Sequence, residues 1–154
     1  MNKKSLITRG YDTLRATALG TLIVSGSMAL GADKPEDADN FYKSDKVAFQ
    51  KVEFRNQYKM KVAGNMYRPG EGAGNAKYPA IIVGHPMGAV KEQSANLYAV
   101  KMAERGFVTL ALDLPFWGES DGNPRNAVSP DIYAEAFSAA ADYLGTQPFV
   151  DRNR

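Results

Sequence analysis

Two short apolar runs, separated by a helix-length segment, constrain this fold more than any other feature of the sequence. The first is A-I-I-V from Ala80, which leads into G-H-P-M-G-A. The second is T-L-A-L from Thr109, which leads into D-L-P-F-W-G-E-S-D-G-N. Uninterrupted apolar runs are typical of strands covered on both faces of a parallel sheet. The pattern predicts a βαβ unit whose loops lie at the carboxyl edge of the sheet, where α/β proteins hold ligands.

The segment before this unit predicts an antiparallel hairpin. Val47 to Phe54 and Gln57 to Tyr67 read as strands, with Arg55 and Asn56 as the tight turn between them. Gly64 interrupts the second strand and predicts a bulge or bend there.

Two helices complete the pattern. Gln93 to Arg105 is expected to be helical, and its apolar positions are Leu97, Val100 and Met102–Ala103. Asp131 to Leu144 is also expected to be helical. Ser129 is the N-cap candidate, Pro130 fits the first turn and Gly145 fits the end of the helix. Its expected buried stripe is Ile132, Ala136, Phe137, Ala140 and Leu144. The predicted order is β-β-β-α-β-α: an antiparallel opening followed by parallel βαβ units in an incomplete α/β sheet.

The N-terminus has the pattern of a secretory signal peptide over residues 1–31. Lys3, Lys4, Arg9 and Arg15 precede an apolar stretch at residues 16–30, which ends in small residues before D-K-P-E-D. Cleavage is expected after Gly31 or Ala32, with export to the periplasm or beyond. The alternative is an uncleaved anchor, for which the apolar stretch is short, because a spanning helix needs about 20 residues. Residues 32–46 are expected to be a linker, and 47–154 the domain.

Charge and cysteine content exclude several classes of protein. The chain has 19 basic and 17 acidic residues. Four of the basic residues and one of the acidic residues lie in the first 31, so the rest of the chain has 15 basic and 16 acidic residues. A net charge near zero gives no reason to expect nucleic-acid binding. The chain has no cysteine, so it holds no disulfide and no thiolate metal site. No metal or organic cofactor is implied by the sequence.

Four segments together resemble the α/β-hydrolase superfamily, in its dienelactone-hydrolase-like or peptidase-like esterase branch. They are K-V-A-G-N-M-Y-R-P, I-I-V-G-H-P-M-G, A-E-R-G-F-V-T-L-A-L-D and D-L-P-F-W-G-E-S-D-G. The resemblance covers about residues 47–154 and implies the N-terminal half of an α/β-hydrolase fold. It also implies hydrolysis of a small-molecule ester or similar acyl bond by a nucleophile–acid–histidine triad.

By this resemblance, the loop after the third strand shapes an oxyanion hole. Met87 would supply one backbone N–H to the developing alkoxide, and His85, Pro86 and Gly88 would shape the loop. The sequence departs from the family at Pro86, where glycine is commoner. A fixed donor of this kind contributes about 3 kcal/mol to stabilising the transition state.

The triad itself is not expected within these residues. In this fold its members follow in the order nucleophile, acid, histidine. The only histidine, His85, precedes every candidate nucleophile, so a structural role is expected for it.

A literal G-x-S-x-G occurs at Gly118–Gly122, but no helix is expected directly after it, as a nucleophile elbow requires. We interpret it as a loop in which Ser120 forms hydrogen bonds and Asp113 braces the chain. Gly118 belongs to the same loop, and Trp117 either lines an acyl pocket or covers the core.

The elbow is expected on a fifth strand after Arg154, so that this chain would be an N-terminal fragment. Without that strand the apolar run at residues 80–83 would be an exposed edge. Two alternatives remain: a non-catalytic remnant or binding module, and a minimal esterase with Ser120 as nucleophile. The sequence does not distinguish a serine from a cysteine nucleophile, nor does it identify the substrate.

Overall fold

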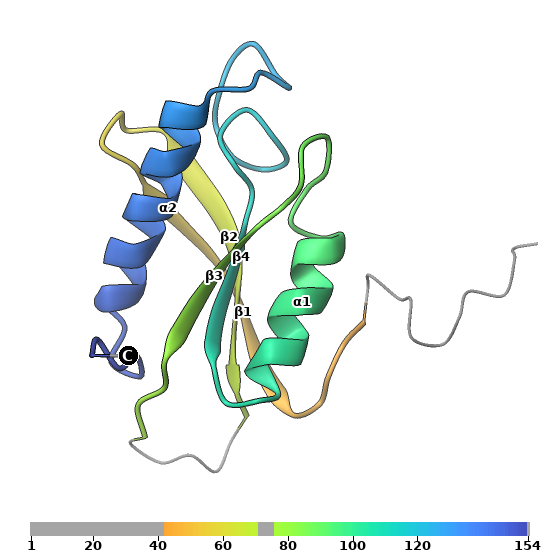
Figure 1. Ribbon diagram of the computed structural model, residues 1–154, viewed down its shortest axis with the longest axis vertical. Helices are drawn as coiled ribbons and strands as arrows, with labels where there is room; N and C mark the ends of the chain where they lie inside the picture. Colours follow the sequence, from red (N-terminus) through yellow and green to blue (C-terminus); the bar gives the residue numbers. More distant parts are fainter. Residues whose placement is uncertain (1–41, 71–75, 154) are drawn as a thin grey trace, which may run out of the picture. The chain divides into compact units, whose positions relative to one another are not determined.

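The computed structural model describes residues 42–70 and 76–153 (Figure 1). The elements are β1 (Val47–Arg55), β2 (Lys61–Pro69), β3 (Ala80–Gly84), α1 (Ser94–Ala103), β4 (Val108–Leu112) and α2 (Pro130–Gly145). This is the predicted order. The predicted signal peptide, and the predicted linker as far as residue 41, lie outside the described residues.

The four strands form one mixed sheet in the order β1-β2-β4-β3. β2 pairs antiparallel with both β1 and β4, whereas β3 and β4 are parallel. Helix α1 connects β3 to β4 and completes the predicted βαβ unit. The described sheet is open and incomplete, so the predicted class of fold, a partial α/β domain with an antiparallel opening, is confirmed.

The hairpin turn is longer than predicted. The last paired residues are Arg55 and Lys61, so the turn is formed by residues 56–60 rather than by Arg55 and Asn56. The Asn56 side chain determines this, because its Oδ1 accepts hydrogen bonds from the N–H groups of Tyr58 and Met60, at 3.1 and 3.0 Å. Asparagine side chains commonly organise turns in this way.

Gly64 is not a bulge, which corrects the sequence prediction. The register of β2 runs unbroken from Lys61 to Pro69 opposite β1, with Gly64 opposite Val52. A Cβ at Gly64 would lie 2.6 Å from Leu110 Cδ1. Close contact with the neighbouring strand therefore explains the glycine.

The two helices cover opposite faces of the sheet, because successive residues of a strand point to opposite sides. Leu110 and Leu112 of β4 belong to the core cluster that includes α2. Ala111, between them, belongs to the cluster that includes α1. Figure 1 shows the helices on either side of the strands.

The buried stripe of α1 differs from the predicted one. Its buried residues are Ala95, Ala99, Val100 and Ala103. Leu97 and Met102 are only half-buried. The small alanines let the helix approach β4, where Thr109 Oγ1 donates a hydrogen bond to the Ala99 carbonyl at 2.9 Å. In α2, Ala136, Ala140 and Leu144 are buried as predicted.

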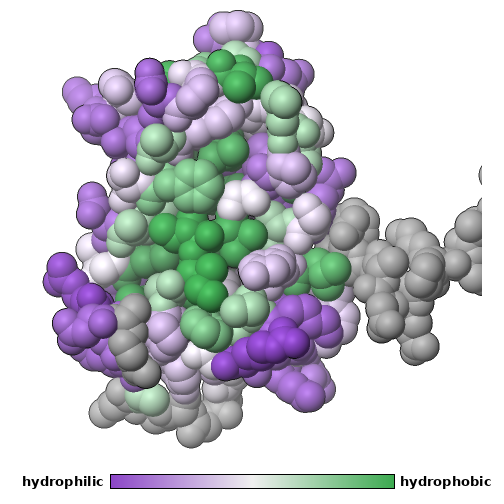
Figure 2. Space-filling model, viewed as in Figure 1, coloured by the Kyte–Doolittle hydropathy of each residue, from purple (hydrophilic) through white to green (hydrophobic). Residues whose placement is uncertain are grey.

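Strand β3 is less covered than its sequence suggests. All five of its residues are half-buried, whereas all five of β4 are buried. The reason is its position, because β3 is the last strand of the described sheet. Apolar surface gathers in the centre of the view in Figure 2, where β3 runs between α2 and α1 in Figure 1.

A single parallel bridge occupies the start of this open edge. The Tyr78 N–H donates to the Phe149 carbonyl at 3.0 Å, and the Asp151 N–H donates to the Tyr78 carbonyl at 2.8 Å. The segment after α2 thus begins a parallel pairing beside β3. None of the helices in the described part of the chain is long and apolar enough to span a membrane.

Candidate active site

Two loops meet at the carboxyl edge of the parallel pair. One follows β3 and runs from His85 to Gln93, and the other follows β4 and runs from Asp113 to Ser129. Because β3 and β4 are adjacent and parallel, both loops leave the same edge of the sheet. The site residues predicted from the sequence all lie in these two loops.

His85 joins the two loops through both ring nitrogens. The Leu114 N–H donates to Nε2 at 3.1 Å, and Nδ1 lies 2.9 Å from the Pro86 carbonyl. Since Nε2 is an acceptor, Nδ1 carries the proton and donates to that carbonyl. The side chain is buried and lies edge-on to Trp117, with 6.1 Å between ring centroids. Both nitrogens are therefore engaged in holding the loops.

The segment from Pro86 to Ala89 forms a type II turn. The Ala89 N–H donates to the Pro86 carbonyl at 3.1 Å, and Gly88 has φ of +83°. A positive φ at the third position of such a turn is the reason for glycine there. Met87 occupies the second position, and the residue is 79% exposed. Within residues 42–70 and 76–153, the Met87 N–H has no hydrogen-bond acceptor.

An ionic cluster around the buried ammonium of Lys91 joins the same two loops. Lys91 Nζ contacts Asp113 Oδ2 at 2.7 Å, Glu92 Oε1 at 2.7 Å and Glu119 Oε2 at 2.9 Å. The side chains of Lys91 and Asp113 are completely buried. Asp113 also accepts backbone N–H donations from Lys91 and Glu119, both at 2.8 Å. Its carboxylate therefore connects the two loops.

The cluster shifts the pKa values of two of its members. Burial by itself would lower the pKa of Lys91, but hydrogen bonds to Asp113, Glu92 and Glu119 outweigh burial and raise it. Hydrogen bonds from Lys91 and Lys51 lower the pKa of Glu119 to about 2. Both groups are therefore charged at neutral pH.

Ser120 lies in a loop and not at a nucleophile elbow. β4 ends at Leu112 and α2 begins only at Pro130. The Ser120 hydroxyl donates to the Asp113 carbonyl at 2.7 Å and accepts from the Ala63 N–H at 2.9 Å. Its side chain is buried, so the hydroxyl connects β2 to the loop and is not presented to a substrate.

Gly118 and Trp117 shape the rest of this loop. Gly118 has φ of +49°, and a Cβ there would lie 2.2 Å from the carboxyl carbon of Asp113. Trp117 Nε1 donates to Tyr133 Oη at 2.6 Å, which joins the loop to α2. Trp117 also packs against the core cluster on the α2 side.

Lys91, Glu92 and Glu119 are the members of this site that the sequence analysis missed. The only signal in the sequence was a lysine six residues after His85 and next to a glutamate. Two of the carboxylates that bury it come from residues 22 and 28 positions away. Among the described residues, no group of histidines and carboxylates is placed to hold a metal ion.

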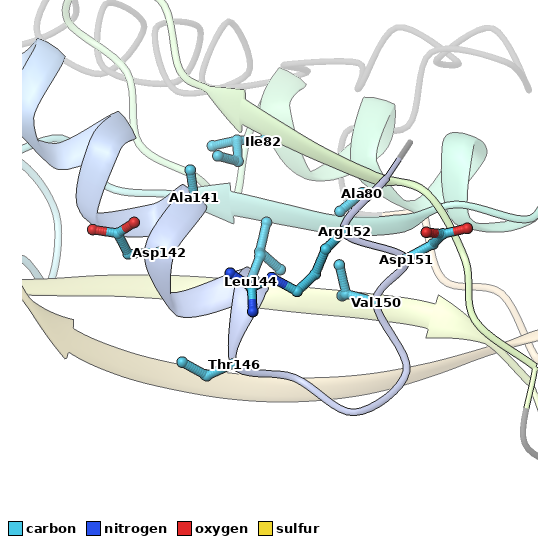
Figure 3. A pocket seen from close by; sticks show the side chains of 10 residues that line it. Ala80, Ile82, Ala141, Asp142, Leu144, Thr146, Val150, Asp151 and Arg152 are labelled. Carbon is cyan, nitrogen blue, oxygen red and sulfur yellow. The ribbon is translucent and has the colours of Figure 1, made fainter.

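A hollow of about 450 Å³ lies away from these loops, beside the open edge of β3 (Figure 3). Ala80 and Ile82 of β3 line it on one side, and Ala141 and Leu144 of α2 line it on the other. Val150 and Arg152, from the segment after α2, also line it. The hollow is lined by no residue of the loop after β3.

A scan against protein-family models finds no match. The chain is 53% identical over 111 residues to PA2218 of Pseudomonas aeruginosa, covering 72% of this chain and 30% of that protein. It is 43% identical to YcjY of Escherichia coli, covering 68% and 35% of the two chains. It is 32% identical to thiohydrolase aneE of Aspergillus aculeatus, covering 67% and 31%. The chain thus spans about a third of the length of these curated relatives.

Solved structures also match this chain over part of their length. The crystal structure of PA2218 matches with a TM-score of 0.71 at 51% identity, over 77% of this chain and 37% of that one. DcsB, in complex with its substrate analogue, matches with a TM-score of 0.61 at 30% identity, over 68% and 34%. The α/β hydrolase GrgF from Penicillium sp. sh18 matches with a TM-score of 0.61 at 25% identity, also over 68% and 34%. The chain belongs to the α/β-hydrolase superfamily, and the described residues form part of that fold.

Proposed function

We propose that this chain is the N-terminal part of an exported hydrolase that cleaves a small-molecule ester or similar acyl bond. The observation that carries the proposal is the Met87 N–H, which is unpaired within the described residues and belongs to an exposed residue in the turn after β3. In an α/β hydrolase, a backbone N–H from this loop is one of the two donors of the oxyanion hole.

The chemistry follows from this position. A nucleophile attacks the acyl carbon, and the carbonyl oxygen becomes an alkoxide. This alkoxide accepts a hydrogen bond from the Met87 N–H. A second N–H comes from the residue after the nucleophile. Donors held in place before the reaction stabilise this charge without any reorganisation.

We further propose that the nucleophile, the acid and the catalytic histidine belong to chain that follows residue 154. His85 has both nitrogens engaged, and Ser120 is buried with its hydroxyl engaged twice. The parallel bridge between Tyr78 and Val150 supports a fifth strand that continues along β3. The hollow between β3 and α2 lies where such a strand would pack.

The names of similar proteins agree with acyl chemistry. One relative is called a thiohydrolase, and one solved neighbour is described in complex with a substrate analogue. Both observations support a small-molecule substrate for this chain. They leave the choice between an oxygen ester and a thioester to experiment.

The first test is the gene sequence beyond codon 154 together with hydrolysis of p-nitrophenyl acetate by the whole encoded protein. A frame that continues into a strand and a G-x-S-x-G or G-x-C-x-G elbow supports the proposal. A stop codon there favours a non-catalytic remnant or binding module. If the 154-residue chain hydrolyses the ester and its Ser120→Ala variant does not, the minimal esterase is favoured instead.

The sharpest variant is Met87→Pro, because proline removes the N–H under test together with the methionine side chain. The second position of a type II turn is one that proline favours, so the turn is retained. We expect kcat to fall by roughly 100- to 1,000-fold, the effect of losing one oxyanion donor. Met87→Ala keeps the N–H and serves as the control. An unchanged kcat in Met87→Pro would contradict the assigned role.

Export is a separate proposal, supported by the basic and apolar segments of residues 1–31. Expression in a bacterium followed by N-terminal sequencing of the periplasmic protein tests it. A mature chain that begins at Ala32 or Asp33 is expected. A cytosolic chain that still begins at Met1 would show the proposal to be wrong.

A further inference from the structure

Lys91 is an exception to the rule that lysine side chains reach solvent. Lysine is almost never fully buried unless it is paired, and the Lys91 side chain has no exposed surface. An ammonium group has three N–H donors. Each has a carboxylate partner here, from Glu92, Asp113 and Glu119, at 2.7 to 2.9 Å.

The cluster anchors one end of the loop that carries Met87. At the start of the loop, His85 accepts from the Leu114 N–H at 3.1 Å. At the end, the Lys91 N–H donates to Asp113 Oδ1 at 2.8 Å, and its ammonium contacts the same carboxylate. Both anchors lie in the loop after β4, so the type II turn between them is held from two sides.

We propose that Lys91 is a positioning residue of the oxyanion loop. Its buried ammonium holds the segment after Met87 against Asp113 and Glu119, so that the Met87 N–H is oriented before the substrate binds. Lys91 does not touch the substrate itself. The inference rests on the proposed role of the Met87 N–H.

A second lysine offers a matched control. Lys51 of β1 contacts the other oxygen of the same carboxylate, Glu119 Oε1, at 3.1 Å. The side chains of this pair are 63% and 52% exposed, and the Lys51 ammonium lies against Glu119 rather than against the loop at residues 85–93. Replacing Lys51 therefore removes one partner of Glu119 without touching the oxyanion loop.

The experiment compares Lys91→Met with Lys51→Met in the whole encoded protein. We expect kcat for p-nitrophenyl acetate to fall by roughly 10- to 100-fold in Lys91→Met, because a small displacement of a catalytic group has effects of this size. We expect KM to stay within about twofold, because the lost interaction acts only in the transition state. Lys51→Met should leave both constants unchanged.

Hydrogen exchange gives a readout that does not depend on activity. The N–H groups of Ala89 and Leu114 are hydrogen-bonded within the two loops, at 3.1 Å in both cases. In Lys91→Met we expect both to exchange about tenfold faster, while the amides of α2 exchange as before. Lys51→Met should leave all of them unchanged.

A double variant accompanies Lys91→Met, because removing one partner of a buried ion pair is strongly destabilising. Lys91→Met/Asp113→Asn leaves no unpaired charge at this pair, and the new side-chain amide oxygen at position 113 still accepts the N–H of residue 91, although the N–H of Glu119 loses its acceptor. The same kinetic and exchange results are expected for it. A folded variant with normal kcat, or uniformly faster exchange throughout the domain, would overturn the proposal. An inactive wild-type protein would refute the proposed function, and hydrogen exchange would still decide the role of Lys91.

Discussion

At the scale of single residues, the main feature is a cation and a carboxylate that stay charged over a wide range of pH. Hydrogen bonds from Lys91 and Lys51 lower the folded-state pKa of Glu119 from its ordinary 4.5 to about 2. Its contribution to stability is therefore present above pH 4.5 and is lost as the pH falls toward 2. The raised pKa of Lys91 means that its contribution is present below 10.5 and is lost only at higher pH.

Glu119→Gln tests this acid dependence. At pH 7 we expect the variant to be less stable by about 1 kcal/mol or less, because Glu119 is half-exposed and solvent screens its ion pairs. As the pH falls from about 5 to about 2.5, the difference between wild type and variant should shrink toward zero. Urea unfolding at several pH values measures it. A difference that stays constant with pH would contradict the assigned shift.

At the scale of elements, two glycines with positive φ have different reasons to be glycine. Gly88 has φ of +83° in the turn after β3, and a Cβ there would meet nothing within 4 Å. Gly118 has φ of +49° in the loop after β4, and a Cβ there would overlap the Asp113 carboxylate at 2.2 Å. The first position is restricted by backbone conformation alone, and the second by conformation and close contact together.

Alanine at these two positions should therefore have unequal effects. We expect Gly88→Ala to lower the free energy of unfolding by about 1–2 kcal/mol, the penalty of a left-handed conformation. Gly118→Ala should lower it by a further ~1–3 kcal/mol, because the added methyl group also displaces a buried side chain. Denaturant unfolding of the two variants measures this, and equal losses would show that the contact with Asp113 is unimportant.

At the scale of the whole molecule, the described sheet ends at a strand that has the composition of an interior one. β3 is A-I-I-V-G, and all of its residues are half-buried. Among the described residues, pairing beyond β3 is limited to the bridge between Tyr78 and Val150. An exposed apolar edge of this kind can pair with another chain.

The 154-residue chain by itself should therefore associate as its concentration rises. Ile81→Lys places a charge on this edge, at a residue outside both core clusters, and we expect it to reduce association. Sedimentation velocity over a range of concentrations compares the two chains. A wild-type chain that remains monomeric throughout would show that the edge is protected.

Much of the fold could be predicted from local pattern. The strand–helix–strand unit followed from apolar periodicity, and β4 and α2 were placed within one residue at each end. The prediction was wrong where side chains decide the backbone path. Asn56 extends the hairpin turn through its side-chain hydrogen bonds. Position 64 requires glycine because Leu110 on another strand leaves no room for a Cβ.

The order of elements, the class of fold and the positions of the two loops could be read from the amino-acid sequence, because these depend on periodicity and on turn residues near in sequence. The three-dimensional arrangement was needed to show that Lys91 is buried among three carboxylates and that Ser120 has no free hydroxyl. It also decided that the Met87 N–H is unpaired within the described residues. Such properties depend on groups distant in sequence, which come together only when the sheet forms.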